Sequence, residues 1–457
     1  MTESSFDLVI LGAGSGGYAT ALRAGQLGMK VALIEGDKVG GTCLHRGCIP
    51  TKAYLHVAEV AETFKHAHQV GVLGAFNGID MNQLGAYRDG VIQKLARGVE
   101  GLLSSRGVQV INGWGRVVDN HTIEVNGQRV TGKKLVLATG SYSKTLPTIP
   151  LGGRIIASEQ ALQMDWIPSK AIVLGGGVIG VEFASVWASF GAEVTILEGL
   201  PHLAPNEDEA ISKALEKAFR KRGIKFQTKA RVAKATQDDY GVHVSTEDGK
   251  TFDADVLLVA VGRGPLTKDM GFEELGLQME RGFVVTNERL RTNVADVYAV
   301  GDIVPGLQLA HRGFLQGIFV AEEIAGLNPQ VIDENTIPRV TFCEPEIASV
   351  GLTEKQAREK YGEGVKSVEY NLAGNGKSNI LGATGLVKLV AAPNGPIVGF
   401  HTIGERMGEQ IGEGELLVGW EAYAEDVANL IHAHPTQNEA IGEAALALAG
   451  KPLHAHN

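Results

Sequence analysis

The chain is poor in cysteine and proline, and its apolar residues never run together for long. Three cysteines in 457 residues exclude a scaffold held together by many disulfides. Fifteen prolines beside 60 glycines, in a chain that is 44% hydrophobic, do not fit a linker or a disordered tract. No stretch reaches 18 consecutive apolar residues, so no membrane span is predicted. The length therefore predicts a folded protein of several domains.

Positive charge is also in short supply. The chain has 42 Lys and Arg against 52 Asp and Glu, a formal net charge of −10. This balance argues against nucleic acid or an anionic membrane as the main partner. The first residues, MTESSFDLVILGAGSGG, have an acidic start and no basic segment, which is not the pattern of a secretory signal. We therefore expect a cytoplasmic protein.

A glycine motif lies close to the N-terminus. A strand, the motif GAGSGG, a helix and a second strand are predicted over residues 6–11, 12–17, 18–27 and 30–35. Gly12 permits a tight turn, Gly14 lets a pyrophosphate approach the backbone, and Gly17 lets the helix pack on the strand. Glu35 ends the second strand, where it can accept hydrogen bonds from ribose hydroxyls. The whole unit predicts a dinucleotide site.

A second copy of this unit follows in the same register. Its strand, motif GGGVIG, helix and second strand are predicted over residues 170–174, 175–180, 181–190 and 193–198. Gly175 follows Gly12 by 163 residues, and Glu198 follows Glu35 by the same number. Glu198 is followed by Gly199, Leu200 and Pro201, with no arginine. An acid at the end of this strand favours the free 2′-hydroxyl of NAD over the 2′-phosphate of NADP. Two such units predict two dinucleotides whose rings meet.

Three further apolar strands each end in glycine and a polar residue. They are predicted over residues 134–140, 256–262 and 297–302 and end at Gly140-Ser141, Gly262-Arg263 and Gly301-Asp302. Ligands of doubly wound sheets bind outside such carboxyl ends. Asp302 is therefore a candidate ligand of cofactor hydroxyls, with a helix N-cap as its alternative role.

Two cysteines lie close together after the first unit. Cys43 and Cys48 form a C-x4-C pair that begins eight residues beyond Glu35. A metal site is disfavoured because no further ligands cluster nearby, so a redox disulfide is the preferred interpretation and two unrelated buried cysteines the alternative. A helix start near Cys48 would favour its thiolate, and Lys52 would lie one turn further along the same face.

The C-terminal part has a different pattern. Two strands around the hairpin signal PNGP and two helices are predicted over residues 387–392, 397–403, 405–420 and 424–431. His434 precedes Glu439 by five residues, a spacing that suits a base oriented by an acid. The alternative is that His432 and His434 are ordinary surface histidines.

Residues 40–52, GGTCLHRGCIPTK, closely resemble the redox-active segment of the pyridine nucleotide–disulfide oxidoreductases. The resemblance covers the whole chain, including both glycine motifs, ATGS at 138–141, Gly262-Arg263, Gly301-Asp302, Leu309-Ala310-His311 and HAHPTQNE at 432–439.

The chain departs from the family pattern at three places. His45-Arg46 stands where the family usually has Asn-Val, and Thr51 where it has Ser. Cys343 lies in a stretch that usually lacks cysteine, and we expect it to be a buried small hydrophobe. Arg46 adds positive charge near the dithiol, with an expected influence on its potential or its access.

The resemblance implies an α/β fold with two Rossmann-like dinucleotide-binding domains and a C-terminal α+β dimerisation domain. The expected parts are an FAD domain over 1–147, an NAD domain over 148–268, a segment completing the FAD site over 269–338, and the interface domain over 339–457.

The resemblance also implies FAD on the first motif, NAD on the second, and oxidation of protein-bound dihydrolipoamide to lipoamide with reduction of NAD. The expected assembly is a homodimer that serves lipoyl-bearing subunits of 2-oxo acid dehydrogenase or glycine cleavage systems. Three alternatives are a reductase of a low-molecular-weight thiol disulfide, a two-dinucleotide monooxygenase or oxidase, and a flavoprotein without enzymatic activity. The first usually prefers NADP, and the second would not need the cysteine pair.

The site residues follow from the same resemblance. The catalytic residues that it implies are Cys43, Cys48, Lys52 and Glu182, and from the other subunit His434 and Glu439. The FAD-binding residues that it implies are Gly12, Gly14, Gly17, Glu35, Gly41, Thr42, Lys52, Gly115, Thr139, Gly140, Ser141, Gly301, Asp302, Leu309, Ala310 and His311. The NAD-binding residues that it implies are Gly175, Gly177, Val178, Ile179, Gly180, Glu198, Val232 and Gly262, and no metal ligand is expected.

Overall fold

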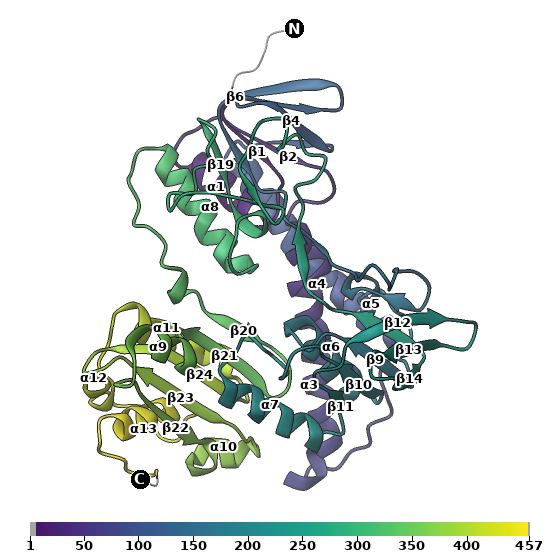
Figure 1. Cartoon of the computed structure of the whole chain (residues 1–457), viewed down its shortest axis with the longest axis vertical. Coiled ribbons are helices and arrows are strands. Elements are labelled where there is room, and N and C mark those ends of the chain that lie inside the picture. The colour runs from purple at the N-terminus through teal and green to yellow at the C-terminus, as the bar shows by residue number, and fades with distance from the viewer. Residues whose placement is uncertain (1–5, 456–457) are drawn as a thin grey trace.

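Three β-sheets, each with its own helices, organise the chain in the computed structural model (Figure 1). The structure describes residues 6–455. The expectation about the N-terminal leader falls partly on residues 1–5, which lie outside the described residues. Within 6–455 no helix has the length and apolarity needed to cross a membrane.

The first sheet has seven strands and carries the first glycine motif. Its order is β3-β2-β1-β6-β5-β4 with β19 on β6, and β1, β2, β3, β6 and β19 run parallel. The strands are β1 Phe6–Leu11, β2 Val31–Glu35, β3 Gln109–Asn112, β4 Gly115–Asp119, β5 Thr122–Val125, β6 Gln128–Leu137 and β19 Val297–Ala299. Helices α1 (Ser15–Gln26) and α8 (Ala310–Ile324) pack on each other beside it, so residues 297–324 complete the first region.

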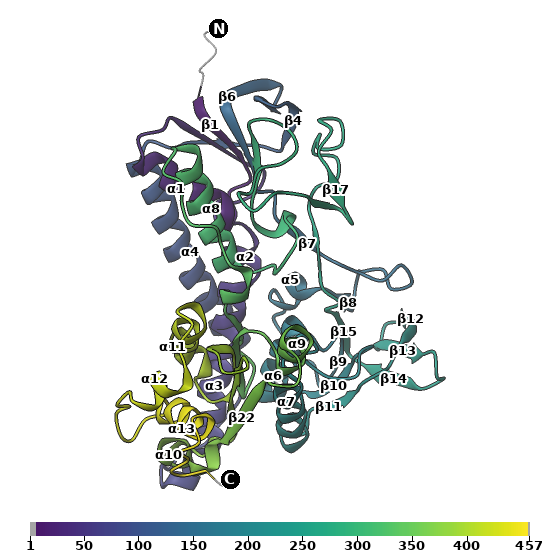
Figure 2. The same cartoon turned by 60° about the vertical axis from the view of Figure 1, so that its left-hand side comes forward.

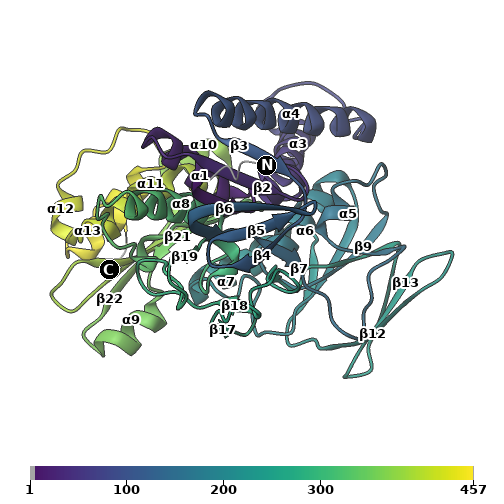
Figure 3. The same ribbon diagram turned by 90° about the horizontal axis from the view of Figure 1, so that it is seen from above.

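The second sheet carries the second glycine motif. Its five parallel strands have the order β11-β10-β9-β15-β8, with a three-stranded antiparallel sheet β12-β13-β14 beside them. The strands are β8 Ile155–Ile156, β9 Lys170–Leu174, β10 Glu193–Leu197, β11 Lys225–Gln227, β12 Val232–Gln237, β13 Val242–Thr246, β14 Thr251–Ala254 and β15 Val256–Val259. The helices are α5 Ser158–Ala161, α6 Val178–Phe190 and α7 Glu209–Lys221. Figure 3 shows β12 and β13 at the edge of the molecule opposite α12.

The chain leaves the first region and returns to it through two paired strands. Strand β7 (Ser141–Ser143) leads out, β16 (Arg263–Pro265) leads back, and the two are antiparallel. A short hairpin, β17 (Met279–Glu280) and β18 (Phe283–Val284), follows the return. The chain therefore passes between the two Rossmann-like regions in both directions at this crossing.

The third sheet is antiparallel, with the order β20-β21-β24-β23-β22. Its strands are β20 Arg339–Thr341, β21 Glu346–Gly351, β22 Lys366–Asn371, β23 Leu386–Ala391 and β24 Ile397–Gly404. Its helices are α9 Glu354–Tyr361, α10 Gly376–Leu381, α11 Met407–Gly419, α12 Ala424–Ala428 and α13 Glu439–Leu448. One face of the sheet packs on α11 and α13, in an apolar core that includes Phe400 of β24 and Ile441 of α13. Ile347 and Ile403, on the other face of the sheet, join the apolar core of the second region.

Three helices of the first region complete the molecule and carry the cysteine pair. They are α2 Gly41–Arg46, α3 Cys48–His66 and α4 Met81–Ser105. Figure 2 shows α3 and α4 extending from the first sheet toward the third. Tyr54 and Ala58 of α3 enter the same apolar core as Phe183 and Ile347. Because this core includes residues from all three regions, it fixes α3 between them.

Most predicted elements occur with small shifts. The strands predicted over 6–11 and 170–174 have the predicted bounds, and the PNGP segment does connect two antiparallel strands. The predicted helix over 424–431 is wrong at its end, because α12 stops at Ala428.

Candidate active site

The cysteine pair occupies the junction of α2 and α3, directly against the first glycine motif. Cys43 lies in α2, and Cys48 is the first residue of α3, with Gly47 as its N-cap. Gly41 has φ +59, and a side chain on it would come within 2.7 Å of the Cα of Gly14. Only glycine allows this approach, which brings the dithiol to the turn where the first motif faces its ligand.

The two cysteines have different acidities. Both are free thiols in this structure, and both are partly buried. The hydrogen bond from the Cys43 thiol lowers the pKa of Cys48 to about 7 against the effect of burial, and the charge of Lys52 lowers it further. The same interaction, together with burial, raises the pKa of Cys43. The reduced pair therefore holds its negative charge on Cys48, at the positive end of α3.

Lys52 is held by groups from the other two regions. Its Nζ lies 2.9 Å from both Oε1 and Oε2 of Glu182 on α6, whose side chain is only 3% exposed. The Phe342 ring covers the ammonium with its centroid at 4.7 Å, and the Phe342 backbone N–H donates to Glu182 Oε1 at 2.9 Å. No sequence pattern indicates Phe342, because nothing local connects it to a lysine 290 positions earlier.

The two glycine motifs have the same stereochemistry, and it fits a pyrophosphate at each. Gly12 and Gly175 have φ +99 and +108. A side chain on Gly17 would collide with the carbonyl oxygen of Gly12, as one on Gly180 would with that of Gly175, so these glycines allow helix and strand to pack. The Cβ positions of Gly14 and Gly177, in contrast, meet no described atom within 4 Å. Each motif therefore leaves open space at the glycine where a dinucleotide would lie.

The acid at the end of each second strand also makes equivalent bonds in the two copies. Glu35 accepts from the backbone N–H of Ala13 at 2.7 Å and of Asp37 at 2.8 Å. Glu198 accepts from the equivalent groups of Gly176 at 2.5 Å and Leu200 at 2.6 Å. A carboxylate has about four acceptor sites, so each acid is oriented and still able to receive ribose hydroxyls.

Asp302 lies where the paired crossing strands meet the first sheet. Ser141 donates its hydroxyl to Asp302 at 2.5 Å, and Arg263 donates to the Ser141 hydroxyl at 2.8 Å. The N-cap of the short helical turn that contains Asp302 is Val300, so the alternative role of Asp302 as an N-cap is wrong. These bonds thus join all three of the predicted strand ends.

The histidine and acid near the C-terminus lie together. The carboxylate Oε1 of Glu439 is 2.7 Å from Nδ1 of His434, and Oε2 accepts from the Thr436 backbone N–H at 2.8 Å. Burial raises the pKa of Glu439, but these two hydrogen bonds outweigh it and hold that pKa below its usual value. The His434 side chain is 78% exposed, and among the described residues neither cysteine bonds to it. The pair is formed but faces outward within its own chain.

The remaining predicted residues are more dispersed. Thr139 donates to the Leu266 carbonyl at 2.5 Å, Leu309 is the N-cap of α8, and His311 Nε2 lies 2.7 Å from the Pro338 carbonyl. Gly115 begins β4 and Val232 begins β12. The other predicted binding residues lie in the motifs and strand ends already described: Thr42, Gly140, Val178, Ile179, Gly262, Gly301 and Ala310.

The three departures from the family pattern have local explanations. Arg46 is paired with Asp37, and His45 Nε2 lies 2.8 Å from the Val39 carbonyl. Thr51 is buried in the first turns of α3. Cys343 is 1% exposed, and burial raises its pKa well above the usual value, which confirms it as a buried residue. Within residues 6–455, no group of three or more His, Cys, Asp or Glu has the arrangement of a metal site.

Known proteins resemble the chain along its full length. Dihydrolipoyl dehydrogenase of Bacillus subtilis (strain 168) is 39% identical over 473 residues, covering 99% of both chains, and that of Geobacillus stearothermophilus is 39% identical, covering 98% and 97%. Among solved structures, LpdA of Mycobacterium tuberculosis superposes with a TM-score of 0.89 at 28% identity over 96% of this chain and 99% of its own. The HOCl-induced flavoprotein disulfide reductase RclA of Escherichia coli gives 0.86 at 27% identity, covering 96% and 99%.

Two family matches cover most of the chain, the first spanning the first and second sheets and the second spanning the third sheet. Residues 6–317 match the pyridine nucleotide-disulphide oxidoreductase description, and residues 337–445 match the dimerisation domain of the same family, which supports a homodimer. The α/β fold with a dimerisation domain is thereby confirmed. The chain belongs to the pyridine nucleotide-disulphide oxidoreductase family.

Proposed function

We propose that the protein oxidises dihydrolipoamide to lipoamide and reduces NAD, using FAD and the Cys43–Cys48 pair. The observation that carries the proposal is the dithiol itself, with a Cys48 pKa of about 7, placed against the first glycine motif and beside the Lys52–Glu182 ion pair. Bound FAD supplies a carrier that accepts the electron pair from the dithiol and passes it as hydride to NAD.

The dithiol half-reaction begins from the oxidised, disulfide-bonded pair. One substrate thiolate attacks Cys43, and Cys48 leaves as a thiolate, which its low pKa favours. The second substrate thiol then displaces Cys43, so that the substrate leaves as a disulfide with both cysteines reduced. Lys52 stabilises the Cys48 thiolate during this exchange, and Glu182 and Phe342 keep the lysine in place.

The base for this exchange is His434. Glu439 bonds to Nδ1 and thereby leaves Nε2 to take a proton from the substrate thiol. Because the pair is exposed within its own chain, we assign it to the site of the other subunit in a homodimer. Each active site would then need both chains.

The second motif binds NAD rather than NADP. Glu198 is oriented at the end of β10, and Gly199, Leu200 and Pro201 provide no cation for a 2′-phosphate. Gly177 leaves open space for the pyrophosphate at the N-terminus of α6.

The test is an anaerobic titration of the FAD-loaded protein with dihydrolipoamide, followed by NAD or NADP. We expect a long-wavelength absorption from a thiolate beside the oxidised flavin, and its loss on adding NAD with formation of NADH. NADPH-dependent reduction of oxidised glutathione, in the absence of dihydrolipoamide turnover, would contradict the assignment and favour a low-molecular-weight disulfide.

The same proposal extends to the cellular context. Lipoyl groups of 2-oxo acid dehydrogenase or glycine cleavage subunits are the proposed substrates, and the cytoplasm is the proposed location. Lipoylated subunit proteins tested beside free dihydrolipoamide would distinguish a protein-bound substrate from a free one.

A further inference from the structure

A continuous row of polar side chains crosses the third sheet on the face toward the second region. Its members are directly opposite neighbours on successive strands, so they share one face: Arg339, Ser349, His401, Lys388 and Glu369. His401 is fully buried and Lys388 is 4% exposed. A buried charge such as the Lys388 ammonium needs partners, because an unpaired buried charge costs free energy. We call these five residues the polar row.

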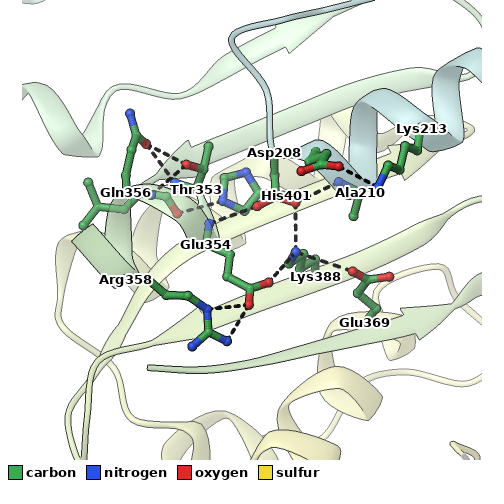
Figure 4. A network of polar contacts seen from close by, with 12 residues as sticks. Asp208, Ala210, Lys213, Thr353, Glu354, Gln356, Arg358, Glu369, Lys388 and His401 are labelled. Carbon is green, nitrogen blue, oxygen red and sulfur yellow. Dashed lines mark hydrogen bonds and ion pairs between the residues drawn. The ribbon is translucent and has the colours of Figure 1, made fainter. Parts of the chain in front are cut away.

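The partners are two acids that precede α7 in the second region. Asp208, 2% exposed, accepts from Lys388 Nζ at 2.9 Å and from the Glu354 backbone N–H at 2.9 Å (Figure 4). Glu207 pairs with Arg339 at 3.4 Å and accepts from the Ser349 hydroxyl. These acids therefore attach the start of α7 to the polar row at two points.

The Lys388 ammonium is the centre of this contact. It lies 2.8 Å from Glu354 and 3.4 Å from Glu369 as well as 2.9 Å from Asp208 (Figure 4). Three carboxylates around one buried cation bind it from the second region and from two elements of the third. Such a geometry fixes position as well as providing stability.

The acids are also joined to the second glycine motif by a short loop. Residues 199–206 run from Glu198 to the acids, and in this loop the Ala204 backbone N–H donates to the Gly176 carbonyl at 2.8 Å. Leu203 packs on Gly176, where an added Cβ would lie 2.6 Å from it. Ala204 has φ +47, a conformation that residues other than glycine rarely adopt and that its surroundings must hold. One end of this loop thus shapes the motif, and the other ends on the polar row.

We propose that Glu207 and Asp208, held by the polar row, are positioning residues for the NAD site. The third sheet then sets the loop that supports Gly176 and Glu198, although among the described residues no hydrogen bond or ion pair joins that sheet to either. This inference rests on the proposed use of NAD at the second motif. Its consequence is that changes at the polar row alter NAD affinity and leave the dithiol side intact.

The test uses Asp208→Asn and Lys388→Gln in the FAD-loaded dimer, with Lys213→Met as the matched control. Asparagine retains an N-cap acceptor, and Lys213 lies on α7 with a 62% exposed side chain paired to Glu209. Calorimetric titration of the oxidised protein with NAD should show affinity weakened roughly 2- to 30-fold, the range for substitutions acting through intervening residues. The KM for NAD should rise in parallel, and the KM for dihydrolipoamide should not change.

The double variant should lose little more NAD affinity than the more affected single variant, because both substitutions break the contact between Lys388 and Asp208. Unchanged NAD affinity with a lowered melting temperature would overturn the inference and leave the contact as a stabilising one. An equal rise of both KM values would also overturn it. If Asp208→Asn does not fold, Ser349→Ala removes one hydroxyl bond to Glu207 and tests the same point. Wild-type protein that binds NAD without oxidising dihydrolipoamide would refute the proposed function, and NAD titration of the variants would still decide this inference.

Discussion

Replacing Lys52 with methionine should raise the pKa of Cys48. The cation lowers that pKa, and without it the nearly buried carboxylate of Glu182 is left to repel the thiolate. The experiment is made in a Cys43→Ser background, where the serine hydroxyl keeps a hydrogen-bond donor at position 43. Cys343 is buried and does not contribute to the titration.

The magnitude follows from the two pKa limits. With a pKa of about 7, about half of Cys48 is thiolate at pH 7. A full return to the ordinary value of 9.0 would leave about 1%, a loss of roughly 50-fold, and each unit corresponds to about 1.4 kcal/mol. The bond from residue 43 remains, so we expect a smaller rise, of about one unit.

The assay is a pH titration of the long-wavelength absorption that the thiolate gives beside the oxidised flavin. Lys65→Met is the control, because Lys65 lies on the same helix, is 28% exposed against 32% for Lys52, and is paired with Glu62. An unchanged midpoint in Lys52→Met, or an equal shift in the control, would refute the assignment of Lys52 as the cation that stabilises the thiolate.

Three other results are expected. In rapid-mixing experiments, His434→Gln should slow reduction of the flavin by dihydrolipoamide by about 10²- to 10⁴-fold and leave reduction of the flavin by NADH unchanged. Equal slowing of both reactions would assign the histidine a structural role. Gly177→Ala should keep the melting temperature and raise the KM for NAD, because the added Cβ lies in the open space that the pyrophosphate would occupy. Gly180→Ala should lower the melting temperature, because its Cβ would clash with the backbone carbonyl of Gly175. A lower melting temperature in Gly177→Ala and an unchanged one in Gly180→Ala would contradict these roles of the glycines. Burial opposes ionisation of Glu354, but hydrogen bonds, led by that from Lys388, lower the pKa of this carboxyl from 4.5 to about 2. The ionised carboxylate therefore stabilises the fold above pH 4.5, and this stabilisation is lost as the pH falls from about 4.5 to about 2. Melting temperatures measured across this range should fall less steeply in Lys388→Met, and an identical slope would refute the pairing.

The sequence predicted best what depends on neighbouring residues. The strands over 6–11 and 170–174 were predicted at their observed bounds because each is an apolar run that a glycine motif terminates. The first helix begins at Ser15 rather than at 18, since the last glycines of the motif already form its first turn. The strand predicted to reach residue 302 stops at Ala299, because Gly301–Ile303 forms a helical turn.

Local sequence patterns do not predict contacts between distant parts of the chain. Cys48 and Lys52 are one helical turn apart, so their association was predictable. Asp208 and Lys388 are 180 positions apart, and no periodicity relates them. The departure from the family pattern in this stretch is Cys343, but it is the neighbouring Phe342 that contacts Lys52. Such contacts depend on how the regions dock, which the spacing of residues within one region does not specify.

The paired strands β7 and β16 have a consequence for the order in which the protein is built on the ribosome. The second region lies between the two parts of the first, because β6 ends at Leu137 and its neighbour β19 begins only at Val297. At 5–20 residues per second, synthesis of the intervening segment takes roughly 8–30 s. By the end of that interval all strands of the second sheet have been synthesised, while the first region still lacks β19 and α8. The NAD-binding region can therefore fold before the FAD-binding region is complete, although its glycine motif comes later in the sequence.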